Sequence, residues 1–127
     1  MSRLLLICLG GAFGTGARYL VSLFVLRSLG PGFPYGTFTV NVIGSFLLAA
    51  IMHVGLATSL LSPTLRLVLG TGVMGGFTTY SSFNYETMQF VQEGAWALAA
   101  LNMTGTLLAC LLAGGLGLAC ARWLVGS

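Results

Sequence analysis

Residues 71–86 read Thr-Gly-Val-Met-Gly-Gly-Phe-Thr-Thr-Tyr-Ser-Ser-Phe-Asn-Tyr-Glu, inside an apolar run that extends from about residue 65 to residue 91. The glycines at 72, 75 and 76 each weaken a helix by about 1 kcal/mol relative to alanine, and a cluster of hydroxyl side chains follows them. In a membrane, open backbone is tolerated only where protein, water or an ion satisfies its polar groups. The stretch therefore predicts a membrane helix that breaks at Gly75–Gly76 and then resumes. The alternative is an ordinary loop between two short helices.

The composition predicts an integral membrane protein. The chain has 127 residues, of which 57% are hydrophobic and 6% charged, and its mean hydropathy is +0.98. Soluble domains average about 25% charged residues, so this chain cannot cover a surface that faces water. A bilayer-spanning helix needs about 20 apolar residues. We expect an all-α, single-domain protein (residues 1–127) with four transmembrane helices at about 4–29, 37–56, 65–92 and 95–123.

The few charges limit the possible functions. Five arginines and no lysine face two glutamates, which is too little for a nucleic-acid-binding patch. In the four-helix order, Arg3, Arg66 and Arg122 fall on the side of the termini, and Arg27 and Arg18 on the opposite side. This is a weak positive-inside bias, so both orientations in the membrane are permitted. The three cysteines, Cys8, Cys110 and Cys120, lack metal-ligand spacing, and we interpret them as small apolar fillers.

The first helix contains a groove of small residues around Gly10 and Gly14, which is typical of close helix packing. A phosphate-binding loop is the other interpretation, but it would need a preceding strand and a lysine or an acidic partner. Arg18 would cost about 2.5–3.5 kcal/mol at the centre of a membrane helix. We therefore expect its side chain at the edge of a wet cavity rather than snorkelling to an interface.

Polar side chains recur at helical spacing in three of the predicted helices. Thr37, Asn41 and Ser45 share one stripe of the second helix. This stripe either joins helices through hydrogen bonds or lines a transport path. On the fourth helix a similar stripe is either a packing seam or a pore wall; it comprises Asn102, Thr106, Cys110, Ala113 and Gly117. Tyr80, Phe83 and Glu86 share one face after the break.

These polar groups favour an anion path. Hydroxyl and amide groups can donate hydrogen bonds to an anion, and the edges of aromatic rings are positive. A proton-coupled exporter would need a carboxylate in mid-membrane, whereas Glu86 falls toward one end of the third helix. Two rival classes remain open: a small proton-coupled multidrug-type exporter, and a non-transporting membrane subunit whose polar stripes are all packing.

Three motifs together resemble those of the Fluc (CrcB) family of fluoride channels. They are Gly-Gly-Ala-Phe-Gly-Thr-Gly-Ala-Arg-Tyr (10–19), Gly-Thr-Phe-Thr-Val-Asn-Val-Ile-Gly-Ser-Phe (36–46), and Gly-Gly-Phe-Thr-Thr-Tyr-Ser-Ser-Phe (75–83) with Glu86. The resemblance covers the whole four-helix chain. It implies a passive, selective fluoride channel rather than an enzyme, which relieves fluoride toxicity in the bacterial inner membrane. It also implies an antiparallel, dual-topology homodimer with two pores, each built from both subunits.

The resemblance also assigns site residues. It implies that Asn41 hydrogen-bonds fluoride, and that Tyr80 and Phe83 occupy the positions of two pore phenylalanines. A structural Na⁺ at the dimer centre would be held by the backbone carbonyls of Gly75 and Thr78. Arg18 matches an arginine beside the pore mouth, and further polar pore-side residues are Thr79, Ser81, Glu86, Asn102, Thr106 and Cys110. The chain departs from the family pattern at Tyr80, where phenylalanine is usual.

Overall fold

The computed structural model describes residues 2–126, and every regular element in that range is a helix. Three long helices are continuous: α1 (Ser2–Leu29), α2 (Tyr35–Ala57) and α6 (Trp96–Val125). Between α2 and α6 the chain forms α3 (Pro63–Leu67), the π-helical segment η1 (Val68–Met74), the single turn α4 (Gly75–Phe77) and α5 (Ser81–Gln92). The all-α prediction and the broken third helix are confirmed.

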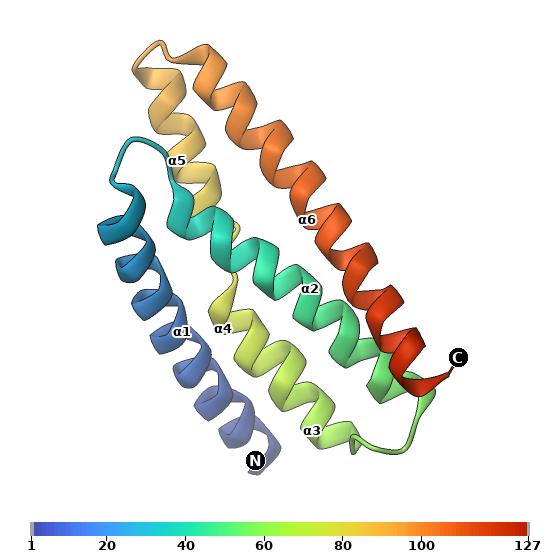
Figure 1. Ribbon diagram of the computed structural model, residues 1–127. Coiled ribbons are helices and arrows are strands. Elements are labelled where there is room, and N and C mark those ends of the chain that lie inside the picture. Colours follow the sequence, from blue (N-terminus) through green and yellow to red (C-terminus); the bar gives the residue numbers. More distant parts are fainter. Residues whose placement is uncertain (1, 127) are drawn as a thin grey trace.

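The protein is a multi-pass membrane protein. Helices α1, α2 and α6 are each long and apolar enough to cross a membrane. In Figure 1 the two ends of the chain lie at the same end of the bundle, as expected when helices alternate in direction. The broken segment between α2 and α6 does not contain one helix of spanning length, because α4 ends at Phe77 and α5 begins at Ser81.

The break lies at Thr78–Tyr80 and not at Gly75–Gly76 as the glycine pattern predicts. Gly76 is helical, and a Cβ atom there would overlap the carbonyl oxygen of Gly11 on α1. That glycine therefore serves close packing between helices. The helix ends because Thr78 takes up extended backbone angles (φ −88°, ψ 163°), which a glycine count along the chain does not reveal.

The small-residue groove of the first helix packs against the broken segment. Gly10 and Gly14 are buried, and a Cβ atom at Gly14 would overlap the carbonyl oxygen of Val73 in η1. In Figure 1, α1 (blue) lies beside η1 and α4 (yellow-green). The packing interpretation of this groove is confirmed.

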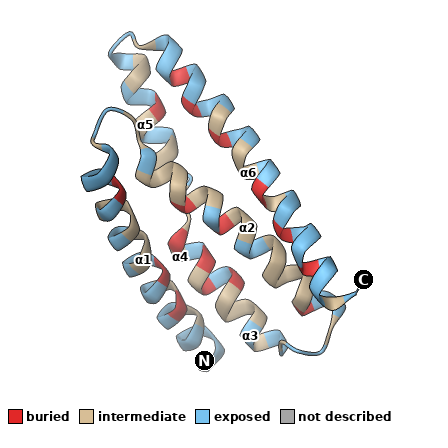
Figure 2. Ribbon diagram, in the orientation of Figure 1, coloured by how far each residue is buried: buried red, intermediate tan, exposed pale blue. Residues whose placement is uncertain are grey.

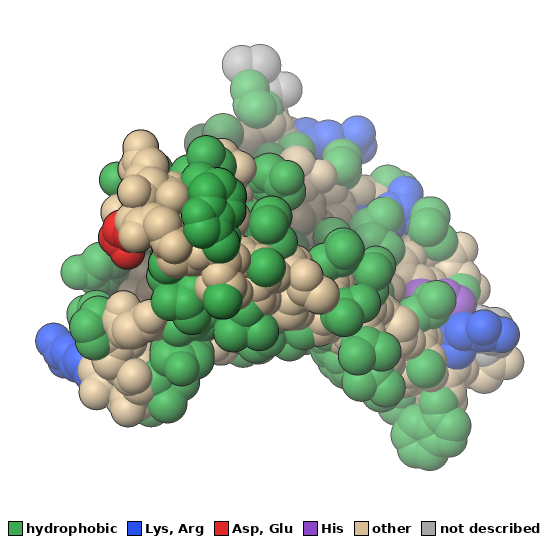
Figure 3. All heavy atoms as spheres, turned by 90° about the horizontal axis from the view of Figure 1, so that it is seen from above, with side chains coloured by type: hydrophobic (Ala, Val, Ile, Leu, Met, Phe, Trp, Pro, Cys, Tyr) green, Lys and Arg blue, Asp and Glu red, His purple; other side chains and the backbone are tan. Residues whose placement is uncertain are grey.

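The buried core is narrow. Val40, Met74 and Phe77 form its centre, and Figure 2 shows that the buried positions form thin lines along the inner helix faces. Large apolar side chains are exposed along α1 and α6, and Figure 3 shows that hydrophobic groups make up most of the visible surface with charges at few points. Since such a surface is incompatible with water, lipid or another protein chain must cover it.

Candidate functional site

A cavity of about 550 Å³, here called the central cavity, opens beside the helix break between α2, α5 and α6. Polar and aromatic side chains from all three helices contribute to its wall. The lining residues are Asn41, Gly44, Ser45, Leu48, Thr78, Thr79, Tyr80, Phe83, Met103, Thr106, Leu107 and Cys110. The structure thus brings together most of the side chains that the sequence analysis singled out, from segments far apart in the chain.

The side chain of Asn41 is hydrogen-bonded to the backbone at the helix break. Its amide nitrogen donates a hydrogen bond to the carbonyl of Thr79, and its amide oxygen accepts one from the N–H of the same residue, each at 2.9 Å. The Thr79 hydroxyl in turn accepts a hydrogen bond from the N–H of Ser82 at the start of α5. Asn41 on the α2 stripe therefore joins two segments of the chain and also lines the central cavity.

Two aromatic rings form one side of the central cavity. Tyr80 and Phe83 meet edge to face, with ring centroids 5.7 Å apart and planes inclined at 67°. The Tyr80 side chain is 79% exposed in the single chain, and within residues 2–126 its hydroxyl makes no hydrogen bond. Its phenol oxygen is therefore available to a ligand, to lipid headgroups or to a second protein chain.

Asn102 lies behind the cavity wall. It is 2% exposed and donates to the Thr87 hydroxyl at 2.9 Å, while its amide oxygen accepts from Thr106 at 3.4 Å. Thr87 donates to the carbonyl of Phe83. The role expected for Asn102, a pore-side polar group, is therefore not visible in this geometry: its amide is used to join α5 to α6. The sequence analysis missed Thr87, although its position one helical turn after Phe83 was a signal.

The α6 stripe has two parts with different surroundings. Ala113 and Gly117 are buried, and a Cβ atom at Gly117 would overlap the carbonyl oxygen of Phe46 on α2. This part of the stripe is a packing seam. One to two turns earlier, Thr106 and Cys110 line the central cavity, so that part of the stripe is a cavity wall.

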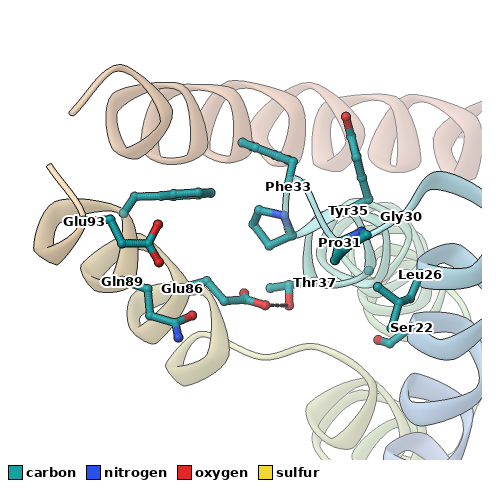
Figure 4. Close-up of a pocket in the computed structure, with 14 residues that line it drawn as sticks. Ser22, Leu26, Gly30, Pro31, Phe33, Tyr35, Thr37, Glu86, Gln89 and Glu93 are labelled. Atoms are coloured by element: carbon teal, nitrogen blue, oxygen red, sulfur yellow. Dashed lines mark hydrogen bonds between the residues drawn. The ribbon is translucent and has the colours of Figure 1, made fainter. Parts of the chain in front are cut away.

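Glu86 belongs to a second cavity of about 410 Å³, here called the outer cavity, between the ends of α1, α2 and α5. In Figure 4 its carboxylate faces Thr37 on α2, whose hydroxyl donates to Glu86 Oε2 at 3.0 Å. Glu86 Oε1 is buried and has no hydrogen-bond partner among the described residues. Ser81 lines a surface hollow together with Ser82, Tyr85, Glu86 and Gln89. Neither Glu86 nor Ser81 lines the central cavity.

Arg18, on α1, reaches the end of α4 next to the helix break. Its Nε donates to the carbonyl of Gly76 at 3.0 Å, which is one of the carbonyls left without a helical partner when α4 ends. Arg18 lines none of the cavities described above, in contrast to the expected position at a cavity edge. Its positive charge nevertheless lies beside the break.

The carbonyls of Gly75 and Thr78 accept no hydrogen bond from residues 2–126, unlike that of Gly76. Backbone carbonyls are ligands suited to hard cations. These two oxygens therefore fit the expected Na⁺, although one chain does not supply enough of them for a complete coordination shell.

Comparison with known proteins agrees with the motif resemblance. The sequence profile of the family "CrcB-like protein, Camphor Resistance (CrcB)" matches residues 5–118. A protein of Anaeromyxobacter dehalogenans named "Fluoride-specific ion channel FluC" is 57% identical over 126 residues, covering 99% of this chain and 100% of that protein. Proteins of the same name from Sorangium cellulosum (57%; 98% of each chain) and Geobacter metallireducens (44%; 98% of this chain, 100% of the other) are also similar. The chain therefore belongs to the CrcB-like family, and the relatives named above are described as ion channels.

Proposed function

We propose that this protein is a passive, selective fluoride channel of the bacterial inner membrane and that fluoride passes through the central cavity. The observation that carries the proposal is the chemistry of the cavity wall. Amide, hydroxyl and aromatic groups line it, and none of its lining residues is a carboxylate. This argues against a proton-coupled exporter, which needs a carboxylate on the transport path to carry the proton.

The wall suits a small anion. Fluoride is strongly hydrated, so a selective path must replace its water with several close hydrogen-bond donors. The positive edges of Tyr80 and Phe83 add weak donors on one side. Passive flow is sufficient for detoxification, because neutral HF enters from an acidic medium, dissociates inside, and the negative interior drives the anion out.

We further propose that two copies assemble antiparallel, with two pathways and a Na⁺ at the dimer centre. The exposed Tyr80 ring and the apolar faces of single chains support a partner chain. The free carbonyls of Gly75 and Thr78 support a shared cation, since a second copy would supply the oxygens that one chain lacks. The nearly balanced arginines support insertion in both orientations.

Efflux from liposomes that contain only this protein tests the channel. With a membrane potential and no proton gradient, we expect rapid fluoride release and chloride release slower by orders of magnitude. Comparable chloride release contradicts the selectivity. A strict requirement for a proton gradient favours the exporter, and a failure to release any ion favours the non-transporting subunit.

A further inference from the structure

The hydrogen bonds around the central cavity show which of its polar groups still have a hydrogen to donate. An anion needs donors whose hydrogens are not already used within the protein. The inference below rests on the proposed function, because it concerns how the same cavity holds its ion.

On the α6 wall, the hydroxyl hydrogen of Thr106 is directed to a neighbouring side chain. The Phe83 carbonyl can only accept, so Thr87 donates to it and presents its oxygen to Asn102. The Asn102 amide nitrogen must then face Thr87, and its amide oxygen must face Thr106. Because an amide oxygen only accepts, Thr106 donates its single hydroxyl hydrogen to Asn102. At 3.4 Å this last hydrogen bond is long and therefore weak, and it directs the Thr106 hydrogen toward Asn102.

The α2 wall and the helix break differ. The Ser45 hydroxyl lines the cavity and makes no hydrogen bond within residues 2–126. The Thr79 hydroxyl accepts from Ser82 but donates to no described residue. Asn41 uses one of its two amide hydrogens on Thr79, which leaves the other. In contrast, Thr78 donates its hydroxyl hydrogen to the carbonyl of Met74.

We propose that Ser45 is an anion-binding residue of the central cavity, which acts with the Thr79 hydroxyl and the second amide hydrogen of Asn41. The ion is held on the α2 side of the cavity. Thr106 forms the opposite wall and contributes shape rather than a donated hydrogen bond.

The test compares four purified variants with the wild type in liposomes, measuring initial fluoride efflux over a range of fluoride concentrations. Ser45→Ala removes the donor, and we expect at least a fivefold rise in the half-saturating fluoride concentration or a fivefold fall in rate. Ser45→Cys keeps the shape with a weak S–H donor and should show a smaller change in the same direction. Ser59→Ala removes the same atom from an exposed loop residue and serves as the matched control.

Thr106→Val provides the second arm. It should change efflux less than Ser45→Ala does, since Thr106 donates nothing to the ion. If the wild type releases fluoride and Ser45→Ala releases it with the same rate and half-saturating concentration, the proposal for Ser45 is wrong while the proposed channel function stands. If Thr106→Val lowers fluoride efflux more than Ser45→Ala does, the ion is held on the α6 side of the cavity, and the proposal for Ser45 is also wrong. If the wild type releases no fluoride, the proposed function itself is wrong. If Ser45→Ala does not fold, Ser45→Cys takes its place. Fluoride efflux by Ser45→Cys equal to that of the wild type then contradicts the proposal.

Discussion

The side chain of Asn41 and the backbone of Thr79 form a closed pair of hydrogen bonds, with the amide of α2 replacing the helical partners that the broken segment lacks. The two residues are 38 positions apart in the chain. Each is also part of the central cavity wall. A single side chain thus holds the backbone at the break and faces the proposed ion path.

Asn41→Ala should lower fluoride efflux at least tenfold while the dimer still forms. It removes a donor from the cavity and leaves the N–H and carbonyl of Thr79 without their partner, which costs about 1–3 kcal/mol of stability. Liposome efflux and size-exclusion chromatography measure the two effects. Asn84→Ala, at an exposed position on α5, is the control. Normal conduction by Asn41→Ala would show that the amide only joins helices.

Tyr80→Phe should raise the fluoride rate, and Phe83→Ile should lower it. The phenol hydroxyl donates to an anion more strongly than a ring edge does, because hydrogen bonds to ionised acceptors are about twice as strong as neutral ones. It also occupies space beside Phe83. Among residues 2–126, no side chain or backbone group forms a hydrogen bond that turns this hydroxyl away. Turnover measured in liposomes decides, and an equal or lower rate for Tyr80→Phe shows that the hydroxyl does not obstruct the path.

Gly14→Ala should destabilise the fold, whereas Gly16→Ala should not. The added methyl group at Gly14 would overlap the Val73 carbonyl, and overpacking costs about 1–3 kcal/mol. At Gly16 nothing lies within 4 Å of the added atom, so the better helix propensity of alanine contributes up to about 1 kcal/mol. Thermal aggregation of the detergent-solubilised protein reports both changes. Equal melting of the two variants would contradict the packing assigned to this groove.

The antiparallel arrangement predicts that Ser2→Cys, in a chain whose native cysteines are replaced by alanine, is labelled from both sides of the membrane. Each orientation places the N-terminus on a different side. A membrane-impermeant maleimide added outside, then after permeabilisation, measures the two fractions. Labelling from one side only would refute dual topology. Cysteine at Ser127, which lies outside the described residues, should give the same result.

Replacing Na⁺ by N-methylglucamine should lower the thermal stability of the assembled protein. A cation that binds only the assembled state stabilises it in proportion to the logarithm of its concentration once it exceeds the dissociation constant. Melting temperatures measured over a series of Na⁺ concentrations at constant ionic strength test this. A flat series argues that the carbonyls of Gly75 and Thr78 are satisfied by water or by the partner chain instead.

The sequence by itself determined the class of the protein and much of its framework. Low charge and long apolar runs require a membrane, because the transfer energy of each side chain is a local property. The groove at Gly10 and Gly14 was readable for the same reason, since small residues at helical spacing permit close packing wherever the partner lies. The positions of Asn41, Tyr80 and Phe83 in the cavity wall also followed from matched motifs.

Only the tertiary structure decided where the third helix ends and what each polar group does. The break falls at Thr78–Tyr80 because Asn41, from another helix, binds the backbone of Thr79, while Gly76 stays helical against α1. Asn102 and Thr106 share one sequence stripe and are joined by a hydrogen bond, yet of the two only Thr106 lines the central cavity. The physical reason is that a hydrogen bond is directional and involves two groups. Whether a hydroxyl donates to its neighbour or remains free for an ion depends on partners that the order of residues along the chain does not specify.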